Sequence, residues 1–236
     1  MIQFYSPDIA ETLTLPESDS HHAVKVMRMR EGDAVQVIDG RGNLYTCRLT
    51  EAHPKHAAVQ ITDRCTQPLP WSQRLTVAVA PTKHLDRMEW LVEKLTEVGV
   101  NRIVPILCER SERRELKAER LRKIAVSAMK QSLKSWLPEV DELTPIRRAV
   151  ETVEARQRFV GYCDESVERR DFASIYRPDT DTVIFIGPEG DFSPAEIALL
   201  TDSGVTPVTL GDNRLRTETA ALYAITACHI LDSTSR

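Results

Sequence analysis

The sequence lacks the two features that would place it in a membrane or outside the cell. No stretch of its 236 residues approaches the ~20 consecutive apolar residues that a helix needs to span a bilayer. Residues 1–18, MIQFYSPDIAETLTLPES, contain no basic segment followed by an apolar core, which a secretory signal requires. We therefore expect a cytoplasmic protein with no membrane partner.

Closely spaced cysteines are also missing. Because the five cysteines are far apart and form no C-x-x-C pair, a structural zinc site or a thioredoxin-like motif is disfavoured. Most of them lie in apolar runs, so we expect reduced, mostly buried thiols and no metal site. The cysteines are Cys47, Cys65, Cys108, Cys163 and Cys228.

The usual nucleotide-binding motifs are absent as well. Neither G-x-G-x-x-G nor G-x-x-x-x-G-K-[ST] occurs anywhere in the chain. These motifs cradle phosphates at a helix N-terminus, so NAD and ATP sites of the common kinds are disfavoured. A nucleoside ligand held mainly by backbone groups stays open.

The net charge of −4 argues against a nucleic-acid partner, but the charge is unevenly distributed. Residues 110–134 carry nine Lys and Arg against three Glu. A local basic patch can bind phosphates even on an acidic protein, because salt screens distant charges. The alternative is a solvated helix face held by ion pairs one turn apart.

Residues 1–68 predict a small β-barrel domain. A short helix with Ser20 as its N-cap precedes three strands, and DGRGN at 39–43 has the composition of a hairpin turn. The linker is expected at 65–73, CTQPLPWSQ, which holds two prolines. The expected strands are 34–38, 43–49 and 57–61.

Residues 74–236 alternate strands with helices, which predicts an α/β domain with a mostly parallel sheet. The first strand, LTVAVAP, is a continuous apolar run, which is typical of a strand covered on both faces. Met88, Leu91, Val92 and Leu95 form an apolar stripe at helical spacing. Strands are expected at 75–81, 102–108, 159–163, 182–187 and 205–211, and helices at 84–100, 117–134, from Ser193 and from Thr217.

Two of these strands end in glycine-containing loops, IGPEGDFS and LGDNRLRTETA. Ligands of open α/β sheets bind outside the carboxyl ends of the strands. Ordinary strand-to-helix turns have a similar composition, so each loop alone is weak evidence. Two such loops, both rich in Glu, Thr and Arg, favour a ligand site.

Together these segments resemble the SPOUT class of S-adenosylmethionine-dependent RNA methyltransferases. The branch they resemble is the ribosomal RNA small subunit methyltransferase E family, which methylates N3 of a uridine in 16S RNA. HHAVKVMRMREGDAVQVIDGRG is similar to the PUA-like domain of that family, and KHLDRMEWLVEKLTEVGVNRIVPILCERS to its next block. The similarity covers essentially the whole chain, with differences at Asp191, where many members have glycine, and at Lys130 and Leu133-Lys134, where many have Glu and Gly-Arg.

The resemblance implies a trefoil-knotted methyltransferase domain, a homodimer, and S-adenosylmethionine bound beside the subunit interface. The partner would be 16S RNA, free or within the assembled small subunit. The apolar helix from Thr217 would be buried by its own sheet on one side and by the partner subunit on the other. A plain core helix is the alternative, since a helix apolar all round is buried in either case.

The resemblance also assigns site residues. Arg216 would hold a uracil carbonyl or a phosphate, with an ion pair to Glu189 or Glu218 as the alternative. Glu218 or Glu189 would accept the N3 proton, although either carboxylate could instead serve a helix N-terminus. Thr217 and Thr219 would also cap the last helix. The expected cofactor residues are Ile186, Gly187, Pro188, Glu189, Gly190, Leu210, Gly211, Leu215, Arg216, Thr217 and Thr219; the expected RNA contacts are His22, Arg28, Lys83, Arg87, Arg110, Arg113, Lys130 and Lys134.

Two other functions stay open at this stage. One is ribose 2′-O-methylation of transfer or ribosomal RNA by the same fold. The other is an RNA-binding module that has lost catalysis.

Overall fold

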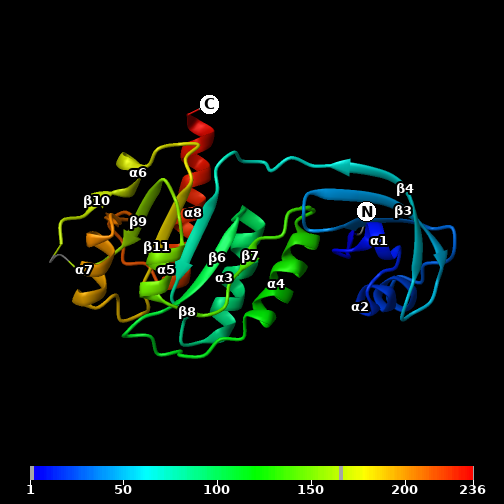
Figure 1. Cartoon of the computed structure of the whole chain (residues 1–236), viewed down its shortest axis with the longest axis horizontal. Helices are drawn as coiled ribbons and strands as arrows, with labels where there is room; N and C mark the ends of the chain where they lie inside the picture. Colours follow the sequence, from blue (N-terminus) through cyan, green and yellow to red (C-terminus); the bar gives the residue numbers. More distant parts are fainter. Residues whose placement is uncertain (1–2, 165–166, 236) are drawn as a thin grey trace. The chain divides into compact units, whose positions relative to one another are not determined.

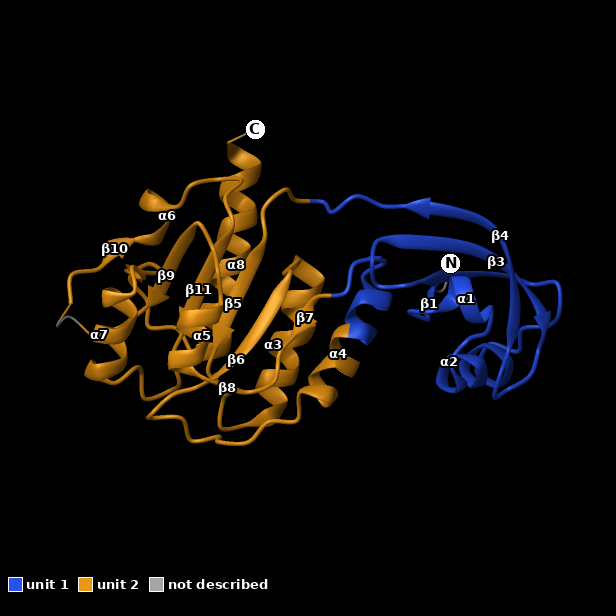
Figure 2. Cartoon of the chain, viewed as in Figure 1, with its two compact units in different colours: residues 1–70, 126–137 blue, residues 71–125, 138–236 orange. Residues whose placement is uncertain are grey.

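The computed structural model describes residues 3–164 and 167–235, which form two compact units (Figure 2). The first unit comprises residues 1–70 together with 126–137, and the second comprises residues 71–125 and 138–236. Helix α4 (Ala118–Gln131) therefore contributes residues to both units. The sequence gives no sign that residues 126–137 pack with the amino-terminal unit.

A four-stranded sheet in the order β1-β2-β3-β4 forms the first unit. Strand β1 runs parallel to β2, and the other pairs are antiparallel. The buried face packs Phe4, Leu15, Val37 and Tyr45 into one apolar core. Its elements are β1 (Gln3–Tyr5), α1 (Ile9–Thr12), α2 (Glu17–His21), the π-helical turn η1 (His22–Val26), β2 (Ala34–Ile38), β3 (Asn43–Glu51) and β4 (Ala58–Thr66).

The three predicted strands and their hairpin are confirmed, whereas the predicted helix start is wrong. Helix α2 begins at Glu17, and Pro16 occupies its N-cap position. The Ser20 hydroxyl instead donates to the Leu15 carbonyl at 2.9 Å and accepts from the Ala57 amide at 2.9 Å. It is a buried bridge between chain segments, which a local capping pattern does not reveal.

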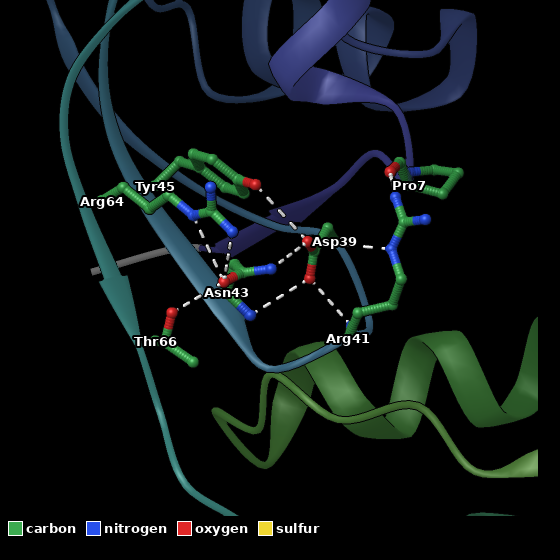
Figure 3. A network of polar contacts seen from close by, with 7 residues as sticks. All are labelled: Pro7, Asp39, Arg41, Asn43, Tyr45, Arg64 and Thr66. Carbon is green, nitrogen blue, oxygen red and sulfur yellow. Dashed lines mark hydrogen bonds and ion pairs between the residues drawn. The ribbon is translucent and has the colours of Figure 1, made fainter.

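The hairpin turn between β2 and β3 is fixed by Asp39, a carboxylate that is only 4% exposed (Figure 3). Its Oδ1 accepts the amides of Arg41 at 2.8 Å and Asn43 at 3.1 Å, and its Oδ2 accepts the Asn43 side-chain amide at 2.6 Å. The Asn43 Oδ1 then accepts hydrogen bonds from Arg64 and Thr66 on β4. Burial and Asp39 raise the pKa of the Tyr45 hydroxyl, which also donates to this carboxylate.

An eight-stranded, all-parallel sheet forms the second unit, in the order β10-β12-β9-β11-β5-β6-β7 with β8 beside β6. The predicted α/β class with a parallel sheet is confirmed. The strands are β5 (Leu75–Val79), β6 (Arg102–Leu107), β7 (Glu139–Val140), β8 (Thr144–Pro145), β9 (Gln157–Gly161), β10 (Arg170–Asp171), β11 (Thr182–Ile186) and β12 (Thr206–Thr209). The helices, besides α4, are α3 (Leu85–Val98), α5 (Ile146–Thr152), α6 (Phe172–Ile175), α7 (Pro194–Asp202) and α8 (Thr217–Thr234).

Helices cover both faces of this sheet (Figure 1). On one face, α5 and α7 pack into an apolar core with alternate strand residues such as Ala78, Val183 and Phe185. Helices α3 and α8 lie side by side, and α8 contacts β5 and β11. Because β5 and β11 are buried along their whole length, they are rich in apolar residues, and Thr76 and Thr182 are their only polar positions.

The beginning of α7 follows its sequence signal. The Ser193 hydroxyl accepts the Glu196 amide, and the Glu196 carboxylate accepts the Ser193 amide at 2.8 Å, which is a complete capping box. Pro194 takes the first helical position, as predicted. This cap fixes the point where the loop after β11 ends.

The thiols of Cys47, Cys108 and Cys228 are buried, and all five cysteines are free. Within residues 3–164 and 167–235 we find no helix with the length and apolar character of a membrane span.

We predict that Asp39→Ala lowers the free energy of unfolding of the amino-terminal unit by about 3 kcal/mol, because buried amides of the turn lose their acceptor. Urea unfolding followed by amide exchange in β2 and β3 measures this loss. Asp63→Ala on β4 is the matched control and should change stability by less than about 0.5 kcal/mol, since Asp63 is exposed. Equal losses in the two variants would contradict the role of Asp39.

Candidate active site

A cavity of about 750 Å³ lies at the carboxyl ends of three adjacent strands of the second unit, β9, β11 and β12. Residues 161–163, 186–189 and 208–218 line it, together with Asp191 and residues from helices α3 and α8. The volume falls in the range of roughly 300–1,000 Å³ that is typical of small-molecule and cofactor sites. Its position is the one expected for a ligand of an open parallel sheet.

Most of the predicted cofactor residues line this cavity. Gly190 and Thr219 do not: the Gly190 carbonyl accepts a hydrogen bond from Arg110 at 2.9 Å, and Thr219 is exposed on α8. The predicted residues in the wall are Ile186, Gly187, Pro188, Glu189, Leu210, Gly211, Leu215, Arg216 and Thr217.

Two glycines in the wall are required for different reasons. At Gly187 a Cβ would lie 3.1 Å from the ring of Phe192, so a side chain would push against a fully buried aromatic. At Gly211 there is open space, but φ is +89°, a conformation that other residues rarely adopt. Both positions bring backbone amides and carbonyls to the cavity surface.

The loop after β11 is held from two other elements. The Thr217 hydroxyl donates to the Gly187 carbonyl at 3.0 Å, and the Lys83 amide donates to the Glu189 carboxylate at 2.9 Å. The prediction that Thr217 and Thr219 cap α8 is wrong: Arg216 occupies the N-cap position, and its side chain makes no cap hydrogen bond. The Thr217 hydroxyl instead links the loop after β12 to the loop after β11 through its hydrogen bond to Gly187.

Arg216 and Glu218 differ in how they are held. Glu218 is buried, and its carboxylate lies 3.6 Å from the guanidinium of Arg87. The alternative in which Arg216 pairs with Glu189 or Glu218 is not observed among the described residues. Arg216 is exposed at the rim of the cavity, and its guanidinium is available to a ligand.

The other predicted RNA contacts of this unit are engaged within the protein. Arg113 donates to the carbonyls of Thr82 at 3.1 Å and Lys83 at 2.7 Å, and the Lys83 ammonium pairs with Glu112 at 3.0 Å. Arg110 holds the loop at Gly190, as described above. These side chains order the loops around the cavity.

Lys130 is engaged inside the first unit. Its ammonium lies 2.7 Å from the Asp19 carboxylate, with the two side chains 22% and 11% exposed, and 5.8 Å from the centre of the Phe4 ring. Asp19 also accepts the Tyr5 amide at 2.7 Å. The structure therefore gives Lys130 a role in packing, in place of an open phosphate contact.

The remaining three predicted contacts also lie in the first unit. His22 packs edge-on against Phe4, with ring centroids 6.1 Å apart, whereas Arg28 is exposed and has a φ of +57°. Lys134 is half-buried. Of these three side chains, Arg28 is the exposed one.

Two protein families match different parts of this chain. Residues 15–62 match a family described as an RNA methyltransferase PUA domain, and residues 69–229 match a family described as an RNA methyltransferase domain. A ribosomal RNA small subunit methyltransferase E from Mycobacterium bovis is 31% identical over 96% of this chain and 89% of its own length. The chain belongs to the ribosomal RNA small subunit methyltransferase E family.

Solved structures agree with this assignment. The crystal structure of a probable rRNA-methyltransferase from Porphyromonas gingivalis is 43% identical, has a TM-score of 0.94 and covers 100% of both chains. A ribosomal RNA small subunit methyltransferase E from Neisseria gonorrhoeae, bound to S-adenosyl methionine, is 28% identical with a TM-score of 0.86 over 98% of both chains. The PUA-like and α/β methyltransferase fold class predicted from the sequence is confirmed; the trefoil knot stays a prediction.

Several of the residues that line the cavity were not predicted from the sequence. The third wall of the cavity follows β9. The sequence predicted this strand, but no ligand-binding role was predicted for the residues at its carboxyl end. The available signal was its apolar run, FVGYC, which stops at the same edge of the parallel sheet. The missed wall residues include Tyr162, Cys163, Arg169, Asp191, Asn213 and Arg214.

Cys163 is the only thiol among the cavity residues that the structure describes. Partial burial, and then the Asp191 carboxylate, raise its pKa above the ordinary thiol value. Because the thiolate is the nucleophilic form, a raised pKa makes this thiol less nucleophilic at neutral pH than an ordinary cysteine. Covalent catalysis by Cys163 is therefore disfavoured.

Proposed function

We propose that the protein transfers a methyl group from S-adenosylmethionine to N3 of a uridine in 16S ribosomal RNA in the cytoplasm. The observation that carries the proposal is the cavity between the GPE and LRT loops, in a chain that belongs to the small subunit methyltransferase E family. The relative from Neisseria gonorrhoeae, which has S-adenosyl methionine bound, supports the choice of cofactor.

The cavity fits this cofactor. Gly187, Gly211 and the turns around them expose backbone donors and acceptors, which suit an adenosyl group with few charges. Gly187, Pro188, Leu210 and Leu215 would hold it. When bound, the sulfonium supplies an electrophilic methyl group.

The chain's own residues must orient the uracil, remove the N3 proton and stabilise the charge that develops on the flanking carbonyls. Arg216 suits the carbonyls, because its free guanidinium presents a fixed fork of donors at the cavity rim. Of the two carboxylates, Glu218 is the better proton acceptor. It is buried at the cavity wall, whereas Glu189 is exposed and one of its oxygens already accepts the Lys83 amide.

Two measurements test the function. Isothermal calorimetry should show S-adenosylmethionine binding, and mass spectrometry of 16S RNA nucleosides should show 3-methyluridine disappearing in cells that lack the protein and returning with the intact gene. Persistence of 3-methyluridine in those cells would refute the substrate. No binding at millimolar cofactor would refute the methyltransferase function itself.

The proposed roles of these residues predict different changes in kcat for three variants. Arg216→Ala should lower kcat by about 10²- to 10³-fold, as loss of a transition-state donor does. Glu218→Gln should lower it by about 10²-fold or more, because an amide cannot accept the proton. Glu189→Gln is the matched control, since its amide oxygen still accepts from Lys83, and should change kcat less than about threefold in single-turnover methyl transfer. A larger effect at Glu189 than at Glu218 would reverse the assignment.

A homodimer through α8 is part of the proposal. One face of α8 is buried against the sheet, while Tyr223 and Ile230 on its other face are 50% and 57% exposed. Trp90 on the adjacent helix α3 is 42% exposed. Since this face of α8 is exposed in the single chain, a partner subunit is a better explanation of its apolar residues than a plain core helix.

The dimer predicts that Tyr223→Glu with Ile230→Glu yields a folded monomer, because two carboxylates cannot be buried in an apolar interface. Light scattering after size-exclusion chromatography measures the mass, and circular dichroism verifies folding. Val26→Glu, an equally exposed apolar position of the first unit, is the control and should leave the mass unchanged. A wild-type protein of about 27 kDa would overturn the dimer.

A further inference from the structure

The loop after β9 leaves the sheet where it enters the cavity wall. Pairing of β9 with β11 ends at Gly161 opposite Ile186, and pairing with β12 ends at Gly161 opposite Val208. The Tyr162 amide still reaches the Val208 carbonyl, at a long 3.4 Å. Beyond this point no strand pairs with Cys163 in the part of the chain that the structure describes.

The Asp191 side chain provides the hydrogen-bond acceptor that the Cys163 amide does not find in the sheet. Its Oδ2 accepts the Cys163 amide at 3.1 Å, and its Oδ1 accepts the Phe192 amide at 2.9 Å. One carboxylate therefore links the loop after β9 to the loop after β11, and all three residues belong to or adjoin the cavity wall. Hydrogen bonds to an ionised acceptor are stronger than those between neutral groups.

The same loop is held from the other side by Arg169. Its guanidinium donates to the carbonyls of Tyr162 at 3.1 Å and Cys163 at 2.9 Å. The Cys163 N–H therefore donates to the Asp191 carboxylate, and the Cys163 carbonyl accepts from the Arg169 guanidinium. This arrangement fixes the orientation of the backbone on both sides of the residue.

The backbone at Asp191 shows that this link has a conformational cost. Its φ is +60°, in the left-handed region that glycine adopts freely and most other residues avoid. The Asp191 amide also closes a turn to the Pro188 carbonyl at 2.9 Å. A glycine would satisfy the turn with less strain but could not reach Cys163.

We propose that Asp191 is a positioning residue for the cofactor, which clamps the loop after β9 to the loop after β11 so that the two walls form one rigid site. This inference rests on the proposed function for the identity of the ligand. The clamp itself depends only on the contacts described above and exists without a ligand. By fixing two walls before binding, it reduces the ordering that binding requires.

Three variants test the clamp in the intact protein. Asp191→Gly removes the carboxylate and relieves the backbone strain, so thermal stability should change little. Asp191→Asn keeps one oxygen that can accept from Cys163 and should restore part of the effect. Asp202→Asn, an exposed carboxylate at the end of α7, removes the same charge away from the cavity and is the control.

In ligand-free protein, amide exchange at Cys163 should accelerate roughly tenfold or more in Asp191→Gly, because the amide loses its acceptor. S-adenosylmethionine affinity should fall roughly tenfold, with KM for the cofactor rising in proportion and kcat at saturation changing less than about twofold. Asp191→Asn should lie between this variant and the wild type, and Asp202→Asn should match the wild type.

Unchanged exchange at Cys163 in Asp191→Gly would overturn the clamp. Faster exchange with unchanged cofactor affinity would overturn its positioning role. Absence of cofactor binding in the wild type would overturn the proposed function, and the ligand-free exchange rates would still decide whether the clamp exists.

Discussion

The cavity depends on the fixed backbone of the loop between Gly187 and Phe192. Strand pairing ends at Ile186, and the capping box of α7 begins at Ser193, so the residues between them have no regular structure of their own. Hydrogen bonds from Thr217, Lys83 and Arg110 hold this loop in place. They come from three different segments of the second unit, and therefore the conformation of this loop depends on contacts that are distant in the sequence.

This dependence explains why the basic character of residues 110–134 is a poor guide to RNA binding. Arg110 and Arg113 bind backbone carbonyls of the cavity loops, and Lys123 pairs with Glu119 one helical turn away. Lys130 is enclosed with Asp19 in the other unit. Most of the local excess of positive charge is thus used in internal contacts, which favours the interpretation of a helix face held by ion pairs.

Features that depend on short-range patterns could be predicted from the sequence. The buried strands β5 and β11 are rich in apolar residues, and the start of α7 follows from Ser193 and Pro194, because these signals operate over a few neighbouring residues. Ser20 shows the limit of such patterns. Its hydroxyl bridges Leu15 and Ala57, and only the folded unit brings these segments together.

The candidate site was predictable to a similar extent. The two glycine-containing loops identified two walls, since both follow strands of one parallel sheet and both are rich in charged and hydroxyl residues. The third wall has a weaker signal, the apolar run FVGYC, and its position follows from the strand order, in which β9 lies between β11 and β12. The use of Asp191 and Arg87 as internal partners also could not be inferred, because their contacts with Cys163 and Glu218 join segments that are distant in the sequence.

Arg216 differs from the other arginines of the second unit discussed above in its lack of an internal hydrogen-bond or ion-pair partner among the described residues. Arg87, Arg110, Arg113 and Arg169 each have an acceptor in the protein, so binding RNA through them would first break a contact that orders the site. Among residues 3–164 and 167–235, Arg216 has no such contact to lose. At the N-cap position of α8 its backbone is fixed by the helix, while its side chain stays available. A guanidinium with a fixed backbone and no internal partner can respond to charge on a substrate without disturbing the cofactor walls, which supports the role proposed for Arg216 in the chemical step.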